Sequence, residues 1–294
     1  MGMPRIRMLH PAGRESDHNL SLAAKELEKS GITVLYEPDP GPRDWPWTAG
    51  DVGTRSQRLN QALLEPDSDM VLCARGGYGS SDLLPHLDWE ALAGRPPKPL
   101  IGFSDISSLH SALRARLGWH GIHGPMPDTD YWETGDAAAL AGVLGQGNPA
   151  GTLTVQPLRE GDDGPEGWLF GGCFTVLTNL IGTPWLPPLK DAILLLEDTG
   201  ETPPRLLRAL NQWQQSGALD DVAAIVLGRF SGCAVAATGV DEEGLLTAMA
   251  SRLDLPVYHC RQFGHCRPNH PWIIGARATI GKQQLNWQTE GNLW

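Results

Sequence analysis

Residues 5–130 alternate short apolar runs with stretches in which apolar residues recur at helical spacing. The runs Ile6–Met8 and Thr33–Tyr36 are typical of short strands, and a helix is predicted between them over Leu20–Ser30. Further helices are predicted over Ser56–Leu64 and Ile106–Leu117. Because strands that alternate with helices form parallel sheets covered on both faces, this pattern predicts an α/β domain with a mostly parallel sheet and flanking helices.

The pattern changes after residue 130. Residues 131–165 are acidic, rich in glycine and interrupted by proline, which is typical of a linker, with one short helix predicted over Ala137–Leu144. From residue 166 onward strand-like and helical runs return. We therefore expect an N-terminal domain at 1–130, a linker at 131–165 and a C-terminal α/β domain at 166–294. In the last part, the predicted strands are Ala192–Leu196, Ala223–Leu227 and Trp272–Ile274, and the predicted helices are Thr175–Leu180, Pro204–Gln215 and Glu242–Leu253.

A serine stands at a predicted strand-to-helix turn. The apolar run Leu100–Ile101 stops at Gly102, and a helical pattern begins at Ile106, which leaves Ser104 in the turn. Hydrolases present a nucleophilic serine on such a turn, because it exposes the hydroxyl and directs free helical N–H groups at an oxyanion. The usual G-x-S-x-G pattern is incomplete, since Ile106 replaces the second glycine. The alternative interpretation is structural: Ser104 or Asp105 caps the helix.

A glycine-rich segment follows another predicted buried strand. The apolar run Val71–Ala74 leads into Arg75–Ser81, which reads RGGYGSS. Glycines allow unusual dihedral angles and close approach to a ligand, and they leave N–H groups free to bind an anion or a carbonyl oxygen. The alternatives are a tight turn or a phosphate loop, although the common nucleotide-binding patterns are absent from this segment.

Several motifs fall in a fixed order along the chain. The first is Ala49–Gly50 with Arg55, and RGGYG and the G-x-S-D turn follow it. The later motifs are Gly124–Met126, Gly171–Gly172, Leu180–Trp185, Leu196–Asp198 with Glu201 and Arg205, and Phe263–His265. In this order and spacing the chain resembles the serine LD-carboxypeptidase family, which includes murein tetrapeptide carboxypeptidases and microcin C self-immunity proteins. The resemblance runs from about residue 5 to 285.

The resemblance implies an active site at the interface of the two domains, with a triad of Ser104, Glu197 and His265. From the residues alone the base and the acid stay open, because the chain has nine histidines and Asp198 is the neighbour of Glu197. Glu197 ends an apolar run, where a strand would hold it in place, and a helix-capping role is the alternative.

The reaction that the resemblance implies is hydrolysis of the amide between an L-configured diamino-acid centre and a C-terminal D-residue, with release of D-alanine from a murein tetrapeptide in cell-wall recycling. The oxyanion donors would be the backbone N–H groups of Gly77 and Asp105. No metal or organic cofactor is needed, and a homodimer is expected. Candidate substrate contacts are Arg75, Tyr78, Cys173 and Arg205, with structural ion pairs as the alternative for the two arginines.

Three positions depart from the family pattern. Asp82 stands where an arginine is common, Arg58 where an aspartate is frequent, and Cys173 where an asparagine usually follows the glycine pair. We interpret Asp82 and Arg58 as a charge swap within one ion pair. Cys173 replaces an amide that would contact substrate, so the identity of the substrate stays open.

The composition of the chain limits the kinds of partner that it is expected to bind. A net charge of −11 argues against binding to nucleic acid or to anionic lipid. No apolar run approaches the roughly 18 residues of a spanning helix, and the first residues lack the apolar core of a signal peptide, so a cytoplasmic protein is expected. Five scattered cysteines fit reduced thiols. The His259–His270 segment is dense in histidine and cysteine, but its spacing matches no common zinc site.

Three other functions stay open. A microcin-immunity-type amidase would use the same triad on peptidyl or aminoacyl nucleotide analogues and would need an aromatic platform, for which Trp45 and Trp47 are the candidates. A catalytically silent muropeptide-binding module would share the fold without a reactive Ser104. A phosphate-binding α/β protein would use Gly76–Gly79.

Overall fold

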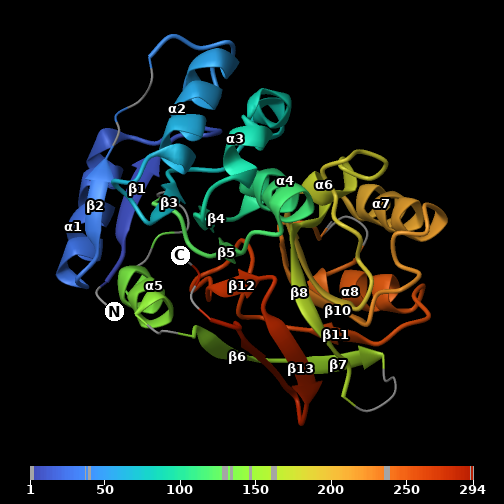
Figure 1. Ribbon diagram of the computed structural model, residues 1–294. Coiled ribbons are helices and arrows are strands. Elements are labelled where there is room, and N and C mark those ends of the chain that lie inside the picture. The colour runs from blue at the N-terminus through green and yellow to red at the C-terminus, as the bar shows by residue number, and fades with distance from the viewer. Residues whose placement is uncertain are drawn as a thin grey trace.

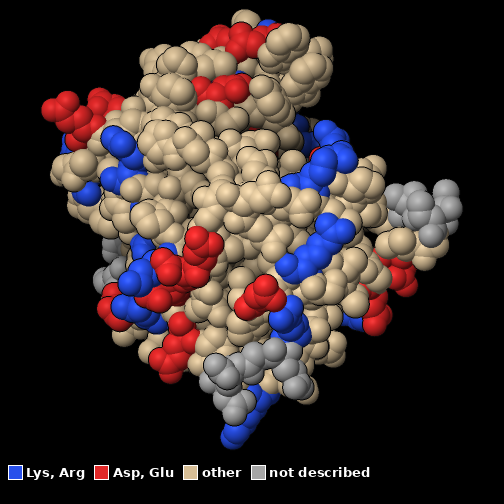
Figure 2. All heavy atoms as spheres, turned by 90° about the vertical axis from the view of Figure 1, so that its right-hand side faces the viewer, with Lys and Arg blue, Asp and Glu red and all other residues tan. Residues whose placement is uncertain are grey.

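Two β-sheets lie side by side and divide the molecule into two lobes (Figure 1). This computed structural model describes residues 3–36, 38, 41–127, 132, 135–145, 148–159, 164–234, 239–291 and 293. No helix among these residues is long and apolar enough to cross a membrane. On the face shown in Figure 2, Lys and Arg are interspersed with Asp and Glu, and no continuous basic patch is visible there.

The first sheet has six strands in the order β12-β5-β4-β3-β1-β2. Its first five strands along the chain are mutually parallel, whereas β12 pairs antiparallel with β5. Every residue of β3, β4 and β5 is buried, as expected for parallel strands covered on both faces. The strands are β1 (Arg5–Leu9), β2 (Thr33–Tyr36), β3 (Met70–Cys73), β4 (Leu100–Gly102), β5 (Gly121–His123) and β12 (Trp272–Ile274).

Helices form two groups around this sheet (Figure 1). One group pairs α1 (Asp17–Lys29) with α5 (Asp136–Leu144), and the other contains α2 (Val52–Leu64), α3 (Trp89–Ala93) and α4 (Ser107–Leu117). Two 3₁₀ turns, η1 (Ser81–His86) and η2 (Ser104–Ile106), follow β3 and β4. The helices predicted from sequence are all present, with ends shifted by a few residues.

Local signals explain where these helices begin and end. The Asp51 side chain accepts a hydrogen bond of 2.6 Å from the Thr54 backbone N–H and so caps α2. The C-cap of α4 is Gly118, whose φ of 70° lies in the left-handed region that glycine adopts without strain.

The second sheet has eight strands in the order β6-β14-β13-β8-β9-β10-β11-β7. Its centre, β8-β9-β10-β11, is parallel, and antiparallel strands extend it on both sides. The strands are β6 (Ala150–Thr154), β7 (Gln156–Arg159), β8 (Glu166–Cys173), β9 (Ala192–Thr199), β10 (Ala224–Ser231), β11 (Val257–His259), β13 (Arg277–Gly281) and β14 (Gln284–Gln288), and the accompanying helices are α6 (Phe174–Thr178), α7 (Pro203–Gln215) and α8 (Glu242–Ala250).

Two sequence expectations differ from this topology. The segment 131–165, expected to be a linker with one helix, also contributes β6 and β7 to the second sheet, and part of it lies outside the described residues. The Trp272–Ile274 strand, expected within the C-terminal domain, lies in the first sheet beside β5. All three strands gain their place through pairing with partners far along the chain, which a local hydrophobic pattern does not encode.

Candidate active site

Ser104 lies at the carboxyl end of β4, in the turn that opens η2 and α4. Its φ is +61°, an uncommon conformation for a residue with a side chain. Strained backbone of this kind is characteristic of a nucleophile held on a sharp strand-to-helix turn. The cap position of η2 is Phe103, which makes no side-chain cap, and the Ser104 hydroxyl is hydrogen-bonded to His265. The capping interpretation of Ser104 is therefore not supported by its geometry.

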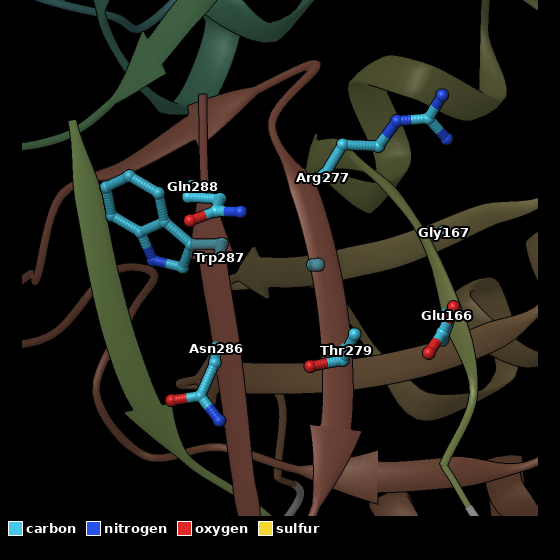
Figure 3. A pocket seen from close by; sticks show the side chains of 8 residues that line it. Glu166, Gly167, Arg277, Thr279, Asn286, Trp287 and Gln288 are labelled. Carbon is cyan, nitrogen blue, oxygen red and sulfur yellow. The ribbon is translucent and has the colours of Figure 1, made fainter. Parts of the chain in front are cut away.

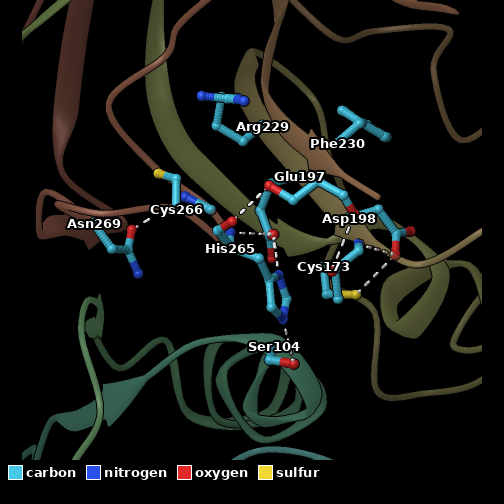
Figure 4. Close-up of polar contacts among 12 residues, drawn as sticks. Ser104, Cys173, Glu197, Asp198, Arg229, Phe230, His265, Cys266 and Asn269 are labelled. Carbon is cyan, nitrogen blue, oxygen red and sulfur yellow. Dashed lines mark hydrogen bonds and ion pairs between the residues drawn. The ribbon is translucent and has the colours of Figure 1, made fainter. Parts of the chain in front are cut away.

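His265 and Glu197 complete a chain of hydrogen bonds with Ser104 (Figure 4). His265 Nε2 lies 3.0 Å from Ser104 Oγ, and His265 Nδ1 lies 2.7 Å from Glu197 Oε2. The same carboxylate oxygen accepts a bond of 3.2 Å from the His265 backbone N–H. With Glu197 ionised, Nδ1 donates and Nε2 is free to accept the serine proton, which is the tautomer that a general base requires.

Close packing fixes the glutamate. Glu197 lies within β9 and is fully buried. Gly264, at φ +111°, packs against it: a Cβ on Gly264 would lie 2.9 Å from Glu197 Cβ and 3.1 Å from Oε2. The Gly264 N–H donates to Asn269 Oδ1 at 3.1 Å. A glycine beside the histidine is thus required both by the backbone angle and by the space that the carboxylate occupies.

Asp198, the rival acid, has a different role. Its Oδ2 accepts bonds from the Thr175 N–H at 2.9 Å and from Thr175 Oγ1 at 2.7 Å, and its Oδ1 accepts from the Thr199 N–H at 2.8 Å. Thr175 lies in the first turn of α6, so Asp198 satisfies a free N–H group at that helix end. Burial raises the pKa of Asp198 from its ordinary value.

The glycine-rich segment packs directly against the serine turn. A Cβ on Gly76 would lie 3.0 Å from Ser104 Cβ and 3.2 Å from Ser104 Oγ, and the Gly76 carbonyl accepts a bond of 2.8 Å from the Gly13 N–H. The next residue, Gly77, has a φ of +99°. The sequence elements predicted to supply nucleophile and oxyanion donors therefore meet in space.

Asp105 connects these two segments. Its carboxylate accepts a bond of 2.9 Å from the Ser80 N–H, and its carbonyl accepts one of 2.6 Å from Ser80 Oγ. Burial is the main cause that raises the pKa of Asp105. The side chain thus holds the glycine-rich segment at a fixed distance from the serine turn. The roles of the Gly77 and Asp105 N–H groups as oxyanion donors remain predictions.

Arg55 has a structural role at the site, and the sequence motif that contains Arg55 did not reveal this role. Its side chain is 1% exposed and donates to the carbonyls of Gly50, Pro11 and Gly79 at 3.2, 2.9 and 2.7 Å. It thereby ties together three loops at the carboxyl edge of the first sheet. A lone arginine in a sequence gives no signal of such a role, since arginines are mostly exposed.

The predicted charge swap is wrong. Asp82 Oδ2 lies 3.8 Å from the Arg55 guanidinium, whereas Arg58 donates to the Pro38 carbonyl at 2.7 Å. Asp82 therefore faces a different cation from the one expected, and the Arg58 guanidinium is bonded to the Pro38 carbonyl instead.

The four predicted substrate contacts have different surroundings. Arg75 lies 3.5 Å from Glu15 and Arg205 lies 3.2 Å from Glu201, so each arginine has an ion-pair partner. Tyr78 is 46% exposed. Cys173 is buried, and its Sγ lies 3.7 Å from Asp198 Oδ1. Burial raises the pKa of Cys173 well above its ordinary value, so this thiol is a poor candidate for a nucleophile or a direct substrate contact.

An aromatic cluster behind the triad was missed in the sequence. Phe103 packs on His265 with ring centres 4.9 Å apart, and His123 stacks on Trp272 at 4.9 Å. Burial lowers the pKa of His123 well below its ordinary value, so this ring stays neutral. His123 precedes the Gly124–Met126 motif, which was the one available signal.

Two cavities differ in their position relative to the triad. One of about 340 Å³ lies on the polar face of β8, β13 and β14 and contains no triad residue (Figure 3). Another of about 540 Å³ is lined by Trp45, Trp47, Gly77 and Tyr78, so it adjoins the predicted oxyanion site. Within the described part of the chain, no group of three or more His, Cys, Asp or Glu side chains is arranged to hold a metal ion.

Known proteins match both lobes. Residues 6–124 match the model of the LD-carboxypeptidase N-terminal domain, and residues 166–280 match that of the LD-carboxypeptidase C-terminal domain. The murein tetrapeptide carboxypeptidase of Pseudomonas aeruginosa is 34% identical over 298 residues, which cover 96% of this chain and 95% of that protein.

Solved structures also resemble this chain over nearly its whole length. The crystal structure of muramoyltetrapeptide carboxypeptidase from Oxalobacter formigenes has a TM-score of 0.85 at 29% identity and covers 98% of this chain and 99% of that one. The structure of MccF in complex with glutamyl sulfamoyl guanosine has a TM-score of 0.85 at 20% identity, covering 99% of each chain, and this likeness shows the fold alone.

The two neighbouring acids allow a matched test. Glu197→Gln removes the charge beside His265 Nδ1 and allows the amide to stabilise the wrong tautomer, so turnover is expected to fall by about 10³–10⁴ with a smaller change in KM. Asp198→Asn should lower the unfolding temperature through the weakened α6 end and leave most of the turnover. A larger loss of turnover in Asp198→Asn, at equal thermal stability, would assign the acid to Asp198.

Gly76→Ala tests the packing at the serine. The φ of Gly76 lies outside the left-handed region, but the new methyl would meet Ser104 Cβ at 3.0 Å, so the hydroxyl must move. A displacement of this order is expected to cost about 10²-fold in turnover, measured as product release, while the circular dichroism spectrum is unchanged. Gly142→Ala in α5 is the control, because no atom lies within 4 Å of its added Cβ. Unaltered turnover in Gly76→Ala would show that the site tolerates movement of Ser104.

Proposed function

Because this chain belongs to the LD-carboxypeptidase family, we propose that Ser104, Glu197 and His265 are its catalytic triad and that it releases D-alanine from murein tetrapeptide. The bond cleaved joins the L-configured centre of a diamino acid to the C-terminal D-residue. The observation that carries the proposal is the unbroken hydrogen-bond chain from Ser104 Oγ through His265 to a buried carboxylate.

The geometry defines the order of proton transfers. His265 Nε2, 3.0 Å from Ser104 Oγ, accepts the serine proton as the oxygen attacks the carbonyl carbon of the diamino acid. The imidazolium then donates that proton to the leaving nitrogen, and D-alanine departs from the acyl-enzyme. Water, deprotonated by the same nitrogen, hydrolyses the ester and regenerates Ser104. Glu197 stays ionised throughout and stabilises the imidazolium.

The developing oxyanion needs donors that are in place before the reaction. The N–H groups of Gly77 and Asp105 are our candidates, because both residues flank the contact between the glycine-rich segment and Ser104. The two hydrogen bonds between Asp105 and Ser80 would keep them at a constant separation.

The relatives favour a murein peptide over the alternatives. Identity to a named murein tetrapeptide carboxypeptidase is 34%, compared with 22% to the microcin C7 self-immunity protein of Escherichia coli. A silent binding module would have no need for a serine in a strained conformation within hydrogen-bond distance of a histidine.

We also propose a cytoplasmic homodimer. The five free cysteines are consistent with a reducing compartment, and sedimentation of the purified protein tests the dimer.

Incubation with murein tripeptide, tetrapeptide, pentapeptide and an acyl-sulfamoyl adenylate tests the function. We expect D-alanine from the tetrapeptide, and a fall of about 10⁴–10⁶ in turnover for Ser104→Ala at unchanged thermal stability. A serine-reactive phosphonate should label the parent chain at Ser104. Cleavage of the adenylate alone would assign the microcin-type activity, and the absence of both labelling and product would indicate a binding module.

The mechanism predicts independence from metal. Since every proposed proton transfer uses Ser104 and His265, activity should be unchanged after dialysis against a strong chelator, measured as D-alanine release. The His259–His270 segment is the region to examine by elemental analysis. About one zinc per chain, with activity lost on its removal and restored on its return, would contradict the serine mechanism.

A further inference from the structure

Three exposed aromatic side chains surround the cavity of about 540 Å³ beside Gly77. Trp45 and Trp47 are 52% and 55% exposed, and Tyr78 is 46% exposed. The two indole rings stack with centres 5.3 Å apart and an interplanar angle of 4°. Large apolar side chains gathered in this way on a surface mark a binding site more often than a chance exposure.

Hydrogen bonds connect this aromatic site to the reacting atoms. The Trp45 carbonyl accepts bonds from the Thr48 N–H and Thr48 Oγ1 at 3.2 and 3.1 Å, and the Ala49 N–H donates to Ala12 at 3.0 Å. The next residue, Gly13, donates to Gly76, which packs on Ser104. The tryptophans are therefore held by the same set of loops that holds the nucleophile.

The direction of the substrate follows from the proton transfers. The leaving nitrogen must face His265 Nε2, and His265 comes from the loop between β11 and β12. The aromatic site adjoins Gly77, on loops of the first sheet. With the leaving part assigned to the His265 side, the acyl part is assigned to the Gly77 side, and its first side chain is that of the diamino acid.

We propose that Trp45, Trp47 and Tyr78 form the subsite for the diamino-acid side chain on the acyl side of the scissile bond. This inference rests on the proposed function. The aliphatic stem packs on the indole faces, and the terminal ammonium lies over an aromatic ring, where the electron-rich face attracts a cation. Tyr78 Oη lies 3.4 Å from Asp82 Oδ1, which adds a negative charge at the rim of the site.

The charge of the surroundings favours an ammonium. Asp82 places a carboxylate beside Tyr78, with Oδ1 on the tyrosine side and Oδ2 3.8 Å from the buried Arg55 guanidinium. Arg75, on the same segment, lies 3.5 Å from the buried Glu15, which offsets its charge. A neutral or acidic side chain would gain the apolar contact here but not the electrostatic attraction.

Matched peptides test the subsite. Two pairs of tetrapeptides differ by one ammonium group at the third residue. The members of one pair carry meso-diaminopimelate or 2-aminopimelate there, and those of the other carry lysine or norleucine. For the parent chain we expect kcat/KM to be about tenfold higher for the ammonium-bearing member. Trp47→Ala should raise KM for that member about tenfold, leave kcat within about threefold, and reduce the preference to less than about threefold, whereas Trp47→Phe should restore most of it.

Leu22→Ala is the control, because Leu22 is an exposed apolar residue of α1 outside the cavity and should change neither parameter. The proposal is overturned if Trp47→Ala keeps both the KM and the ammonium preference of the parent. It is also overturned if this variant changes only the sedimentation coefficient, which would make the aromatic site a contact between copies of the chain. Failure of the parent to release D-alanine from any peptide would instead refute the proposed function.

Discussion

The hydrogen bond between His265 Nε2 and Ser104 Oγ, 3.0 Å long, joins side chains that come from opposite lobes, and catalysis requires those lobes to stay in register. The chain secures this by its path. The loop that carries His265 leaves the second sheet at β11 and enters the first sheet at β12, so the histidine is anchored on both sides. Trp272, in β12, pairs with His123 of β5 and packs at 6.1 Å on Phe263, two residues before the histidine. This buried aromatic packing holds the loop that carries His265 against the first sheet.

A second constraint acts on the loops of the first sheet. Arg55 donates to three loop carbonyls from a nearly inaccessible position, and Gly79, at φ +111°, leaves room for it: a Cβ there would lie 2.7 Å from Arg55 Nη1. Buried carbonyls without donors are costly, so one guanidinium satisfies what would otherwise require several separate contacts. The segment from Ala49 to Arg55 thus serves to hold the loops of this chain together. Its effect on chemistry is indirect, through the placement of Gly76 beside Ser104.

Local pattern was sufficient for most helices and for β1 to β4 of the first sheet, because each carries its own apolar periodicity, and the helices also carry end signals such as Asp51 and Gly118. It was not sufficient for β6, β7 and β12, whose placement depends on distant partners. Among the candidate site residues, the strand-to-helix turn at Ser104 was visible from the residues themselves. The choice of His265 among nine histidines came from resemblance to a family, since nothing local separates it from His259 or His270. Burial of Cys173 and the true neighbour of Asp82 depend on side-chain directions that no one-dimensional pattern contains.

The two adjacent acids of β9 show how stability and catalysis are divided. Asp198 accepts three hydrogen bonds from nitrogen and oxygen donors and closes a helix end, so both of its carboxylate oxygens have partners in the resting protein. Glu197 is fully buried, both of its hydrogen bonds fall on Oε2, and Oε1 has no partner among the described residues. A buried carboxylate that is only half satisfied destabilises the folded state, by an amount on the order of a few kcal/mol. This cost is offset only when His265 carries a proton. The imidazolium then lies beside the Glu197 carboxylate in surroundings of low polarity, where the attraction between opposite charges is strong. The glutamate is therefore placed for the protonated intermediate of the reaction and not for the resting enzyme, and a stable fold around it has to come from the apolar strands on either side.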